Sequence, residues 1–372
     1  MMEKEKIGNI TEKVSKWDPR KDALNQFISY IDLSSVDKDL KKINNDKIEV
    51  IKGEDAPSRA RQLVKQNDIL VSTVRPNLNG VAIIEEDYDN ATASTGYSVL
   101  RCKENCYFRY LYFWTLTPAF VEDMINKASG ASYPAVSDRI IKESKIPLPP
   151  LPTQKKIAAI LDAADAYRQK TKALIKKYDE LSQSLFLDMF GDPVVNPKGW
   201  EKKELGLITH LKAGNFVSAS EINSIKSVDL YPCYGGNGLR GFVQSYTHDG
   251  NFVLIGRQGA LCGNVKTVNG KFHATEHAIV CSQKMEYNTL WLYYLLDLLN
   301  LNKHATGAAQ PGLNVGTLNK LDVVYAPFGL QNQFADRIQK IEVQKAQAQE
   351  SLVKAEELFN SLLGRAFKGE IN

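Results

Sequence analysis

The fold is decided by the stretch TQKKIAAILDAADAYRQKTKALIKKYDELSQSLFLDM, residues 153–189. No glycine or proline interrupts it, so it can form one continuous helix. At alternating steps of four and three residues, one face is mostly apolar or small, and its largest apolar members are Ile157, Leu161, Ile175, Tyr178 and Leu185. This spacing predicts one long coiled-coil helix, roughly 55 Å long at 1.5 Å per residue. We expect Thr153 to cap its start, just after Pro152, and Gly191 to end it.

The same pattern returns 177 residues further along, from Ile157 to Phe334. The second apolar face contains Phe334, Ile338, Leu352, Phe359 and Leu362. A cation in the face repeats too, as Arg168 and Lys345, and upstream SGASYPAVSD (129–138) aligns with TGAAQPGLNV (306–315). The sequence therefore predicts two copies of one unit, each a globular half followed by a long helix.

Length and composition limit the classes of protein to which the chain can belong. With 372 residues, the chain has room for two globular halves and their helices. No apolar run reaches the roughly 18 residues of a membrane span, and the first residues lack the apolar core of a secretory signal. We expect a cytoplasmic protein without membrane contact. The net charge of +4 does not by itself indicate a nucleic-acid partner.

The globular halves repeat the same order of elements. In residues 1–150 we expect strands at 27–36, 68–74, 81–84 and 95–101, and an aromatic helix at 108–129. In the second half, 205–214 resembles 7–15, 251–265 matches the hairpin at 68–84, and 289–300 replaces the aromatic helix. The turn residues of 191–200 separate the first long helix from this second half.

Two short patterns suggest an enzyme, and neither has the context that its chemistry needs. GNGLRG (236–241) matches GxGxxG, but no helix pattern follows to hold a pyrophosphate. HATEH (273–277) matches HxxEH, in which a helix places His273 and His277 on one face around zinc, but its surroundings are strand-like. The five cysteines form no CxxC pair. We expect a chain without catalytic residues, metal or cofactor.

Polar loop residues are the remaining candidates for chemistry. Arginine can bond guanine through two parallel hydrogen bonds, and asparagine or glutamine can bond adenine in the same way. The alternative is that these are ordinary surface loops, but their duplication suits two half-sites. The candidate DNA-binding residues are Arg61, Arg75, Asn77, Asn79, Ser132, Tyr133, Asn237, Arg240, Arg257, Gln258 and Gln310.

The sequence resembles the specificity (S) subunit of type I restriction-modification systems. The resemblance is carried by GASYPAVSDRIIKESKIPLPPLPTQKKIAAILD (130–162) and by its second version GAAQPGLNVGTLNKLDVVYAPFGLQNQFADRI (307–338). LFLDMFGDP (185–193) and WEKKELGLI (200–208) also resemble the family's helix end and second-domain start. The second helix start reads APFGLQNQ instead of PLPPLPTQ, which leaves the geometry of its turn open.

The resemblance implies an α+β architecture of two tandem mixed α/β target recognition domains, separated by two long helices that form an antiparallel coiled coil with an internal pseudo-two-fold repeat. The boundaries would be 1–150 and 193–329 for the two domains, and 151–192 and 330–372 for the central and C-terminal helices. Each domain would read one half of a bipartite double-stranded DNA target, and the helices would set the spacing.

The resemblance also implies partners. The subunit would be non-catalytic alone and would recruit two methyltransferase (M) subunits, which use S-adenosylmethionine to methylate adenine. In the full complex it would recruit two restriction (R) subunits, which use ATP with Mg. Two interpretations from other classes stay open at this point: a coiled-coil scaffold that binds no DNA, and a zinc enzyme that uses the HxxEH stretch.

Overall fold

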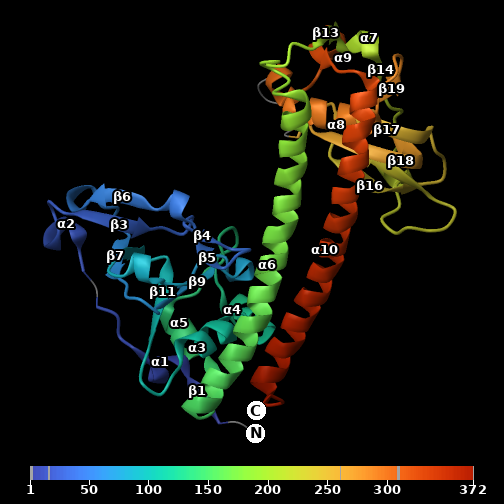
Figure 1. The fold of residues 1–372 in the computed structure, drawn as a ribbon. Helices are drawn as coiled ribbons and strands as arrows, with labels where there is room; N and C mark the ends of the chain where they lie inside the picture. Colours follow the sequence, from blue (N-terminus) through green and yellow to red (C-terminus); the bar gives the residue numbers. More distant parts are fainter. Residues whose placement is uncertain (1–2, 16, 260, 308–310, 372) are drawn as a thin grey trace. The chain divides into compact units, whose positions relative to one another are not determined.

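The computed structural model describes residues 3–15, 17–259, 261–307 and 311–371. They form two compact units: unit 1 is Met1–Ala173 with Glu350–Asn372, and unit 2 is Leu174–Gln349. Two long helices, α6 (Leu151–Phe190) and α10 (Phe328–Lys368), each contribute one part to each unit (Figure 1). Each unit therefore holds one globular domain and two adjoining helix segments.

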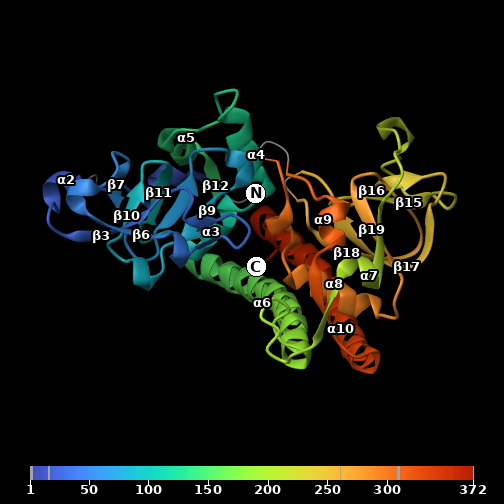
Figure 2. The same ribbon diagram turned by 90° about the horizontal axis from the view of Figure 1, so that it is seen from above.

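The unit 1 domain is built on an antiparallel sheet in the order β2-β11-β8-β9, whose strands are Thr11–Glu12, Tyr97–Cys102, Ile69–Ser72 and Val81–Ile83. A second sheet, β6-β3-β10-β7, lies on the side of the domain away from α6 in Figures 1 and 2; its strands are Glu49–Lys52, Phe27–Ile31, Thr92–Ser94 and Ala60–Leu63. The remaining strands pair as β1-β12 (Lys4–Lys6, Lys145–Pro147) and β4-β5 (Val36–Asp37, Lys42–Ile43). The helices are α1 (Ile7–Ile10), α2 (Pro19–Asp22), α3 (Phe108–Thr115), α4 (Pro118–Lys127) and α5 (Asp138–Glu143).

The unit 2 domain is built on one sheet in the order β14-β19-β17-β18-β15-β16. Its strands are Thr209–Ala213, Ala278–Gln283, His248–Gly256, Val265–Ala274, Tyr231–Gly235 and Gly238–Val243. A separate pair is β13-β20 (Glu201–Glu204, Asp322–Tyr325), and the helices are α7 (Leu205–Ile208), α8 (Thr289–Leu298) and α9 (Val315–Asn319).

The predicted internal repeat is confirmed by the strand order. The four strands β2-β11-β8-β9 of unit 1 correspond one by one to β14-β19-β17-β18 of unit 2. Backbone bonds repeat as well: Ile7 N–H donates to the Ser144 carbonyl, and Leu205 N–H donates to the Leu321 carbonyl. The predicted match between 251–265 and the hairpin at 68–84 is also confirmed, since β17-β18 and β8-β9 pair antiparallel.

Within each unit the long helices are part of the domain core. In unit 1, Ile157 and Leu161 near the start of α6 pack with Phe359 and Leu363 near the end of α10 against the aromatic helix α3. In unit 2 the roles exchange: Phe334 and Ile338 of α10 pack with Phe186 and Phe190 of α6. In both units the two segments run antiparallel, because residues early in one helix meet residues late in the other.

At the start of each helix, residues of the predicted face such as Ile157 and Phe334 are buried, whereas near the end the burial of two predicted residues differs. Leu185 and Leu362 are only partly buried, whereas the next residues, Phe186 and Leu363, are fully buried. A straight α-helix drifts away from a 3.5-residue repeat. In the last turns of each helix, successive buried residues are four positions apart, as Phe186 and Phe190 are in α6, and they pack on a domain core.

The central part of the predicted face is less buried. Ile175, Tyr178 and Leu352 are half-buried. The two cations of the face each have an acidic partner in their own unit: Arg168 lies 2.5 Å from Asp165, and Lys345 lies 2.6 Å from Asp179. The Arg168 guanidinium also stacks 4.3 Å from the centroid of the Phe359 ring.

Both long helices begin in the same way. α6 starts at Leu151 instead of Thr153, because Pro152 fits the first turn, where no backbone N–H is needed. Thr153 is therefore not the N-cap. In unit 1, the backbone N–H groups of Thr153 and Gln154 donate to the Pro150 carbonyl. In unit 2, those of Leu330 and Gln331 donate to the Pro327 carbonyl, so the APFGLQNQ sequence forms the same turn as PLPPLPTQ.

A buried glutamine fastens each helix start to its domain. Gln154 Oε1 accepts from Tyr107 N–H at 2.8 Å, and its Nε2 donates to the carbonyls of Asn105 and Pro149. Gln331 repeats this in unit 2, where it accepts from Asn288 N–H at 2.8 Å and donates to the carbonyl of Ala326. Tyr107 and Asn288 are the N-cap residues of α3 and α8. In each unit, one side chain thus links the long helix to the main apolar helix of the domain.

Two details of the unit 1 prediction are wrong. The helix expected at 108–129 is two helices, because Thr117 caps the backbone N–H of Phe120 and Pro118 begins α4 as a new helix. The strand expected at 27–36 ends at Ile31, and a turn precedes β4.

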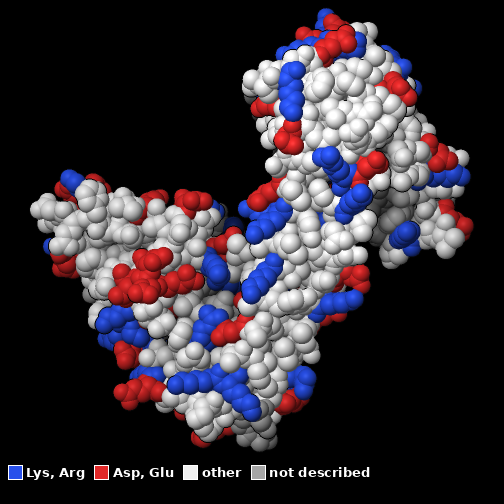
Figure 3. Space-filling view, viewed as in Figure 1, with Lys and Arg blue, Asp and Glu red and all other residues white. Residues whose placement is uncertain are grey.

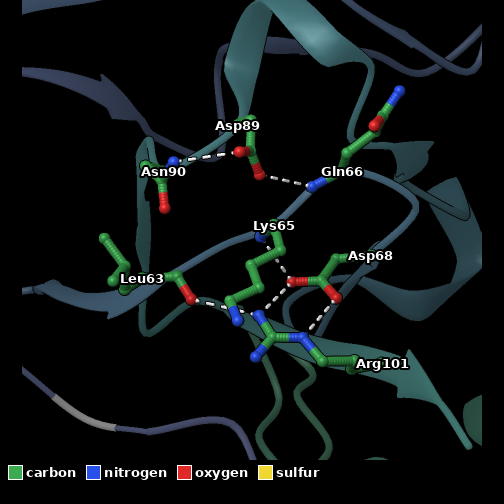
Figure 4. Close-up of polar contacts among 7 residues, drawn as sticks. All are labelled: Leu63, Lys65, Gln66, Asp68, Asp89, Asn90 and Arg101. Carbon is green, nitrogen blue, oxygen red and sulfur yellow. Dashed lines mark hydrogen bonds and ion pairs between the residues drawn. The ribbon is translucent and has the colours of Figure 1, made fainter.

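A buried ion pair holds the central strands of unit 1 together (Figure 4). Arg101 Nε and Nη2 donate to the two carboxylate oxygens of Asp68 at 2.8 and 2.7 Å, and Lys65 N–H donates to the same carboxylate. Asp68 precedes β8 and Arg101 lies on β11, so the pair joins neighbouring strands. The Asp68 carboxylate raises the pKa of Arg101. Figure 4 also shows Asp89 bonding Gln66 N–H on the adjoining turn.

Among the helices described above, none combines the length and the apolar character that a membrane crossing needs.

We expect Gln154→Leu to lower the free energy of unfolding by about 3 kcal/mol, because one backbone donor and two carbonyls lose a buried partner. Urea denaturation measures this change. The control Gln347→Leu lies at an exposed position of α10 and should change stability by less than about 0.5 kcal/mol. A loss below about 1 kcal/mol for Gln154→Leu would contradict the role assigned to this side chain.

Candidate nucleic-acid interface

The candidate site of unit 1 is formed by two loops that the sequence separates. The loop 73–79 joins β8 to β9, and the segment 129–136 pairs with it. Val136 N–H donates to the Thr73 carbonyl at 2.8 Å, and Arg75 N–H donates to the Pro134 carbonyl at 2.7 Å. We call this arrangement the unit 1 loop pair. It brings five predicted residues onto one end of the sheet: Arg75, Asn77, Asn79, Ser132 and Tyr133.

Arg75 is the most distinctive residue of this loop pair. Its backbone is left-handed, with φ 51° and ψ 64°, which costs a residue other than glycine roughly 1 kcal/mol. Its guanidinium stacks 4.5 Å from the centroid of the Tyr133 ring, and that ring is 67% exposed. Both side chains border a hollow of about 150 Å³. The loop thus presents an exposed cation on an exposed aromatic ring.

The other residues of the loop have different surroundings. Asn77 and Ser132 are exposed. The Asn79 carbonyl accepts from Lys41 Nζ at 2.5 Å, and burial lowers the pKa of Lys41 to about 8. Lys41 and Lys38, which also borders the hollow, are cations near the loop that the sequence prediction missed.

Unit 2 contains the equivalent loop pair. The corresponding loop of unit 2 follows β17 and precedes β18; its Gln258 pairs with Gly312, which also pairs with Thr306. Leu313 N–H donates to the Arg257 carbonyl at 2.8 Å, and Gly259 N–H donates to the Pro311 carbonyl at 2.9 Å. These bonds correspond to those of Val136 and Arg75 in unit 1. We call this arrangement the unit 2 loop pair.

Side chains of the unit 2 loop pair form a connected polar cluster. His277 Nδ1 lies 3.2 Å from Gln258 Oε1, and His277 Nε2 lies 3.1 Å from Glu276 Oε1. Arg257 Nη1 approaches the Glu276 carbonyl at 3.4 Å. The structure therefore brings the predicted residues Arg257 and Gln258 together and adds two that the prediction did not include.

A hairpin carries two further predicted residues. Asn237 lies in the turn between β15 and β16, and its Oδ1 is 3.5 Å from Asn264 Nδ2. Arg240, exposed on β16, lies beside Gly235. This hairpin contains the GxGxxG pattern and no helix directly follows it, so the helix N-terminus that holds a pyrophosphate in dinucleotide-binding folds is not formed there. Gln310 lies outside the described residues.

Arg61 is placed apart from the unit 1 loop pair. It lies on β7, in the second sheet, and is ion-paired with Asp18. Its Nε also donates to the Ser58 carbonyl at 3.0 Å. Its guanidinium is therefore already engaged within the domain.

The HxxEH pattern does not form the helical pair that zinc enzymes use. His273 is buried at the end of β18, whereas His277 lies in the turn before β19. Over the residues that the structure describes, no three His, Cys, Asp or Glu side chains are grouped so as to hold a metal ion.

Charge is mixed on the surface. Figure 3 shows that lysine, arginine, aspartate and glutamate side chains all occur on the face drawn. The candidate sites are distinguished by the position of individual polar side chains on paired loops.

The residues missed by sequence reasoning could have been found by aligning the loops. The loop after β8 in unit 1 aligns with the loop after β17 in unit 2 when residue numbers differ by 184, as for Arg75 and Gly259. The next equivalent strands, β11 and β19, align when residue numbers differ by 181, as for Tyr97 and Ala278. His277 directly precedes β19, and at this offset it corresponds to Gly96. Arg257 N–H donates to the His277 carbonyl as Thr73 N–H donates to the Gly96 carbonyl. The constant offset of 177 did not place His277 beside the loop.

The family model of the type I restriction modification DNA specificity domain matches residues 4–178 and 197–352. The chain belongs to this family. The type I restriction enzyme EcoprrI specificity subunit of Escherichia coli is 33% identical over 276 residues, which are 70% of this chain and 67% of that protein. The MjaIX specificity subunit of Methanocaldococcus jannaschii is 22% identical over 338 residues, 81% of this chain and 77% of that protein.

Solved structures show the same fold. The S subunit of a type I restriction-modification system from M. genitalium has a TM-score of 0.63 at 16% identity and covers 99% of this chain and 96% of its own. A chain from a study of assembly and conformational transition of the type I system has a TM-score of 0.58 at 22% identity, with 98% and 97% covered. The expected fold class, two target recognition domains joined by long antiparallel helices, is confirmed.

We expect Arg75→Gly to leave the free energy of unfolding unchanged or raise it by up to about 1 kcal/mol, because glycine adopts the left-handed backbone without strain. The control Arg139→Gly, in helix α5, should lower it by about 1 kcal/mol. Urea denaturation compares the two. Equal destabilisation by both changes would show that Arg75 carries no backbone strain.

Proposed function

We propose that the chain is the DNA sequence-recognition subunit of a type I restriction-modification complex, in which each domain reads one half of a bipartite double-stranded target. The observation that carries the proposal is the equivalence of the two loop pairs. They occupy the same place on equivalent sheets, are held by corresponding backbone hydrogen bonds and carry different polar side chains. Two equivalent supports with different side chains suit two half-sites of different sequence.

The chemistry of the unit 1 loop pair fits base reading. Arg75 is exposed and carries donors that match guanine in the major groove, and Asn77 can bond adenine. Tyr133 stacks on the Arg75 guanidinium and restricts its orientation. In unit 2, Arg257 and Gln258 are the corresponding candidates. Arg61 contributes less in this proposal, because Asp18 already holds it.

The long helices would set the distance between the half-sites. α6 has 40 residues and α10 has 41, which is about 60 Å for each at 1.5 Å per residue. Since the start and the end of each helix pack in different domain cores, a change in helix length would change the spacer of the target.

The helices would also bind the methyltransferase subunits. α6 exposes Tyr167, Leu174 and Leu181 at intervals of seven residues, and α10 exposes Val343, Val353 and Leu358. The exposed apolar side chains of α6 share one helix face at this spacing, which suits docking of a partner helix. We propose two M subunits with S-adenosylmethionine and, through them, two R subunits with ATP and Mg. The cofactors would belong to these partners and the chain alone would be non-catalytic.

The decisive test is to co-express the chain with its cognate methyltransferase and to map modified adenines across the host genome by single-molecule sequencing. We expect a split motif with two specified blocks around a fixed gap. Replacing residues 1–150 by those of another family member should change one block only. Arg75→Ala should weaken binding to the mapped target about 5- to 150-fold. Absence of modified adenines with an active partner would favour the scaffold interpretation.

Leu181→Asp and Leu358→Asp should reduce the amount of methyltransferase that copurifies with the chain, because both side chains are exposed and no domain core loses a member. We expect at least a tenfold weaker association, since each change removes about 1.5–3 kcal/mol of apolar burial. The control Gln349→Asp adds the same charge at another exposed position of α10. Unchanged copurification with both leucine variants would exclude this surface.

A further inference from the structure

The side chain of Lys41 holds the far end of the loop that carries Arg75. Its Nζ donates to the Asn79 carbonyl at 2.5 Å, across 38 positions of the sequence. An ammonium can only donate and a carbonyl can only accept, so the direction of this bond is fixed by the chemistry of the two groups. Lys41 therefore ties the loop 73–79 to a segment outside the two strands that the loop joins.

The segment that carries Lys41 is itself fixed to the domain. Lys41 lies in the turn between β4 and β5, which pair antiparallel. Val36 on β4 is buried in a core that includes side chains of β8, β9 and β11, the strands around the loop. In the turn, Asp37 Oδ1 accepts from the N–H groups of Asp39 and Leu40, both at 2.9 Å. The backbone of Lys41 is left-handed, with φ 55°, a conformation that persists in residues other than glycine where the surrounding structure holds it.

The contact completes a loop that is held at both ends. A short 3-10 turn, Pro76–Leu78, separates Arg75 from Asn79, and both of these residues have a left-handed backbone. The first end is held where Arg75 N–H donates to the Pro134 carbonyl, and the last end is held by Lys41. The exposed side chains of Arg75 and Asn77 thus project from a loop whose two ends are bound to different segments.

Unit 2 holds the corresponding loop end by another side chain. Gly263 corresponds to Asn79, because the backbone bonds of the two loops align when residue numbers differ by 184. There, Asn302 Nδ2 donates to the carbonyl of Cys262, the residue before Gly263, at 2.9 Å. Both units therefore hold this end of the loop through a side-chain donor from a neighbouring segment, and the donors come from different parts of the domain.

We propose that Lys41 is a positioning residue for the unit 1 loop pair, which fixes the loop from which Arg75 and Asn77 read bases. This inference rests on the proposed DNA-reading function. A bidentate contact to a base edge needs both of its hydrogen bonds at once, whereas contacts to the DNA backbone carry no sequence information. Freedom at the loop end therefore lowers the preference for the correct base more than it lowers binding to DNA in general. Lys41 acts through the loop and touches no base.

The charge of Lys41 does not stabilise the domain. Burial lowers the pKa of Lys41 to about 8; Asp39 opposes this change and Arg168 adds to it. A lysine whose pKa is lowered on folding has a charged form that is less favourable in the folded chain than in the unfolded chain. Asn79 is only half-buried, so water can replace the ammonium at its carbonyl. An uncharged side chain of similar length at position 41 should therefore leave the domain folded.

The experiment uses the complex of the full chain with its methyltransferase and duplexes of the mapped target. In each duplex, one base pair of the block that residues 1–150 specify is replaced. Fluorescence anisotropy gives the affinity ratio between the mapped and the altered target. We expect Lys41→Met to lower this ratio at least about fivefold for one or more base pairs of that block. The ratios for base pairs in the other block should not change.

Two matched variants and a stability measurement accompany Lys41→Met. Lys41→Arg keeps a side-chain donor and should retain most of the preference. Lys42→Met removes the same charge at the adjacent exposed position, so it reports the loss of non-specific attraction and should leave every ratio unchanged. Urea denaturation of Lys41→Met should give the same midpoint as the natural chain.

Three results would overturn the inference. Equal weakening of all duplexes by Lys41→Met would identify Lys41 as a contact to the DNA backbone. Unchanged binding to every duplex would show that the loop does not need the contact. A lower urea midpoint for Lys41→Met would assign the side chain a structural role. In each case the mapped split motif still upholds the proposed function. If no specific target exists, both the inference and the proposed function fail.

Discussion

The buried glutamine at the start of each long helix is the interaction on which the rest of each unit depends. Its carboxamide supplies an acceptor and two donors in one side chain, which matches the backbone N–H and the carbonyls that meet there. A glutamate would supply no donor, and a leucine would leave these groups unsatisfied. The direction of α6 relative to α3, and of α10 relative to α8, is therefore set by polar geometry, and apolar packing around it fills the space.

The two domains keep their backbone framework while their sequences diverge. The corresponding bonds join residues at offsets of 177, 181, 184 and 198, so insertions and deletions fall in the connecting loops and leave the paired segments aligned. Main-chain bonds do not depend on side-chain identity, except where the backbone is left-handed. There, unit 2 uses Gly259 and Gly263, whereas unit 1 uses Arg75 and Asn79. Unit 1 tolerates the unfavourable φ of Arg75 because the neighbouring segment holds its N–H.

The sequence predicts the features that repeat at short range and misses those that depend on distant residues. Spacing identified both helices, and the duplication identified the paired halves. The change from Leu185 to Phe186 was not predicted, because the last turns of α6 pack on the domain core as well as on the partner helix. The pairing of Asp68 with Arg101 joins two strands across many residues and leaves no local pattern.

The candidate site shows the same division. Arg75 and Tyr133 were both identified from loop composition, but their stacking depends on the pairing of 73–79 with 129–136. His277 was considered only as a metal ligand, because HxxEH is a pattern of helices. On a strand and its following turn, the same letters place one histidine in the core and the other beside Gln258.

If the loop pairs read DNA as proposed, this separation of framework and side chains would let such a chain change what it binds without refolding. The loop pairs are held through backbone N–H and carbonyl groups, so replacing an exposed side chain removes little stability. The exceptions are residues whose side chains also support a neighbour, as Lys41 does for Asn79. Changes at such positions alter two contacts together. Recognition should therefore change in small steps at isolated loop residues and in larger steps where side chains are coupled.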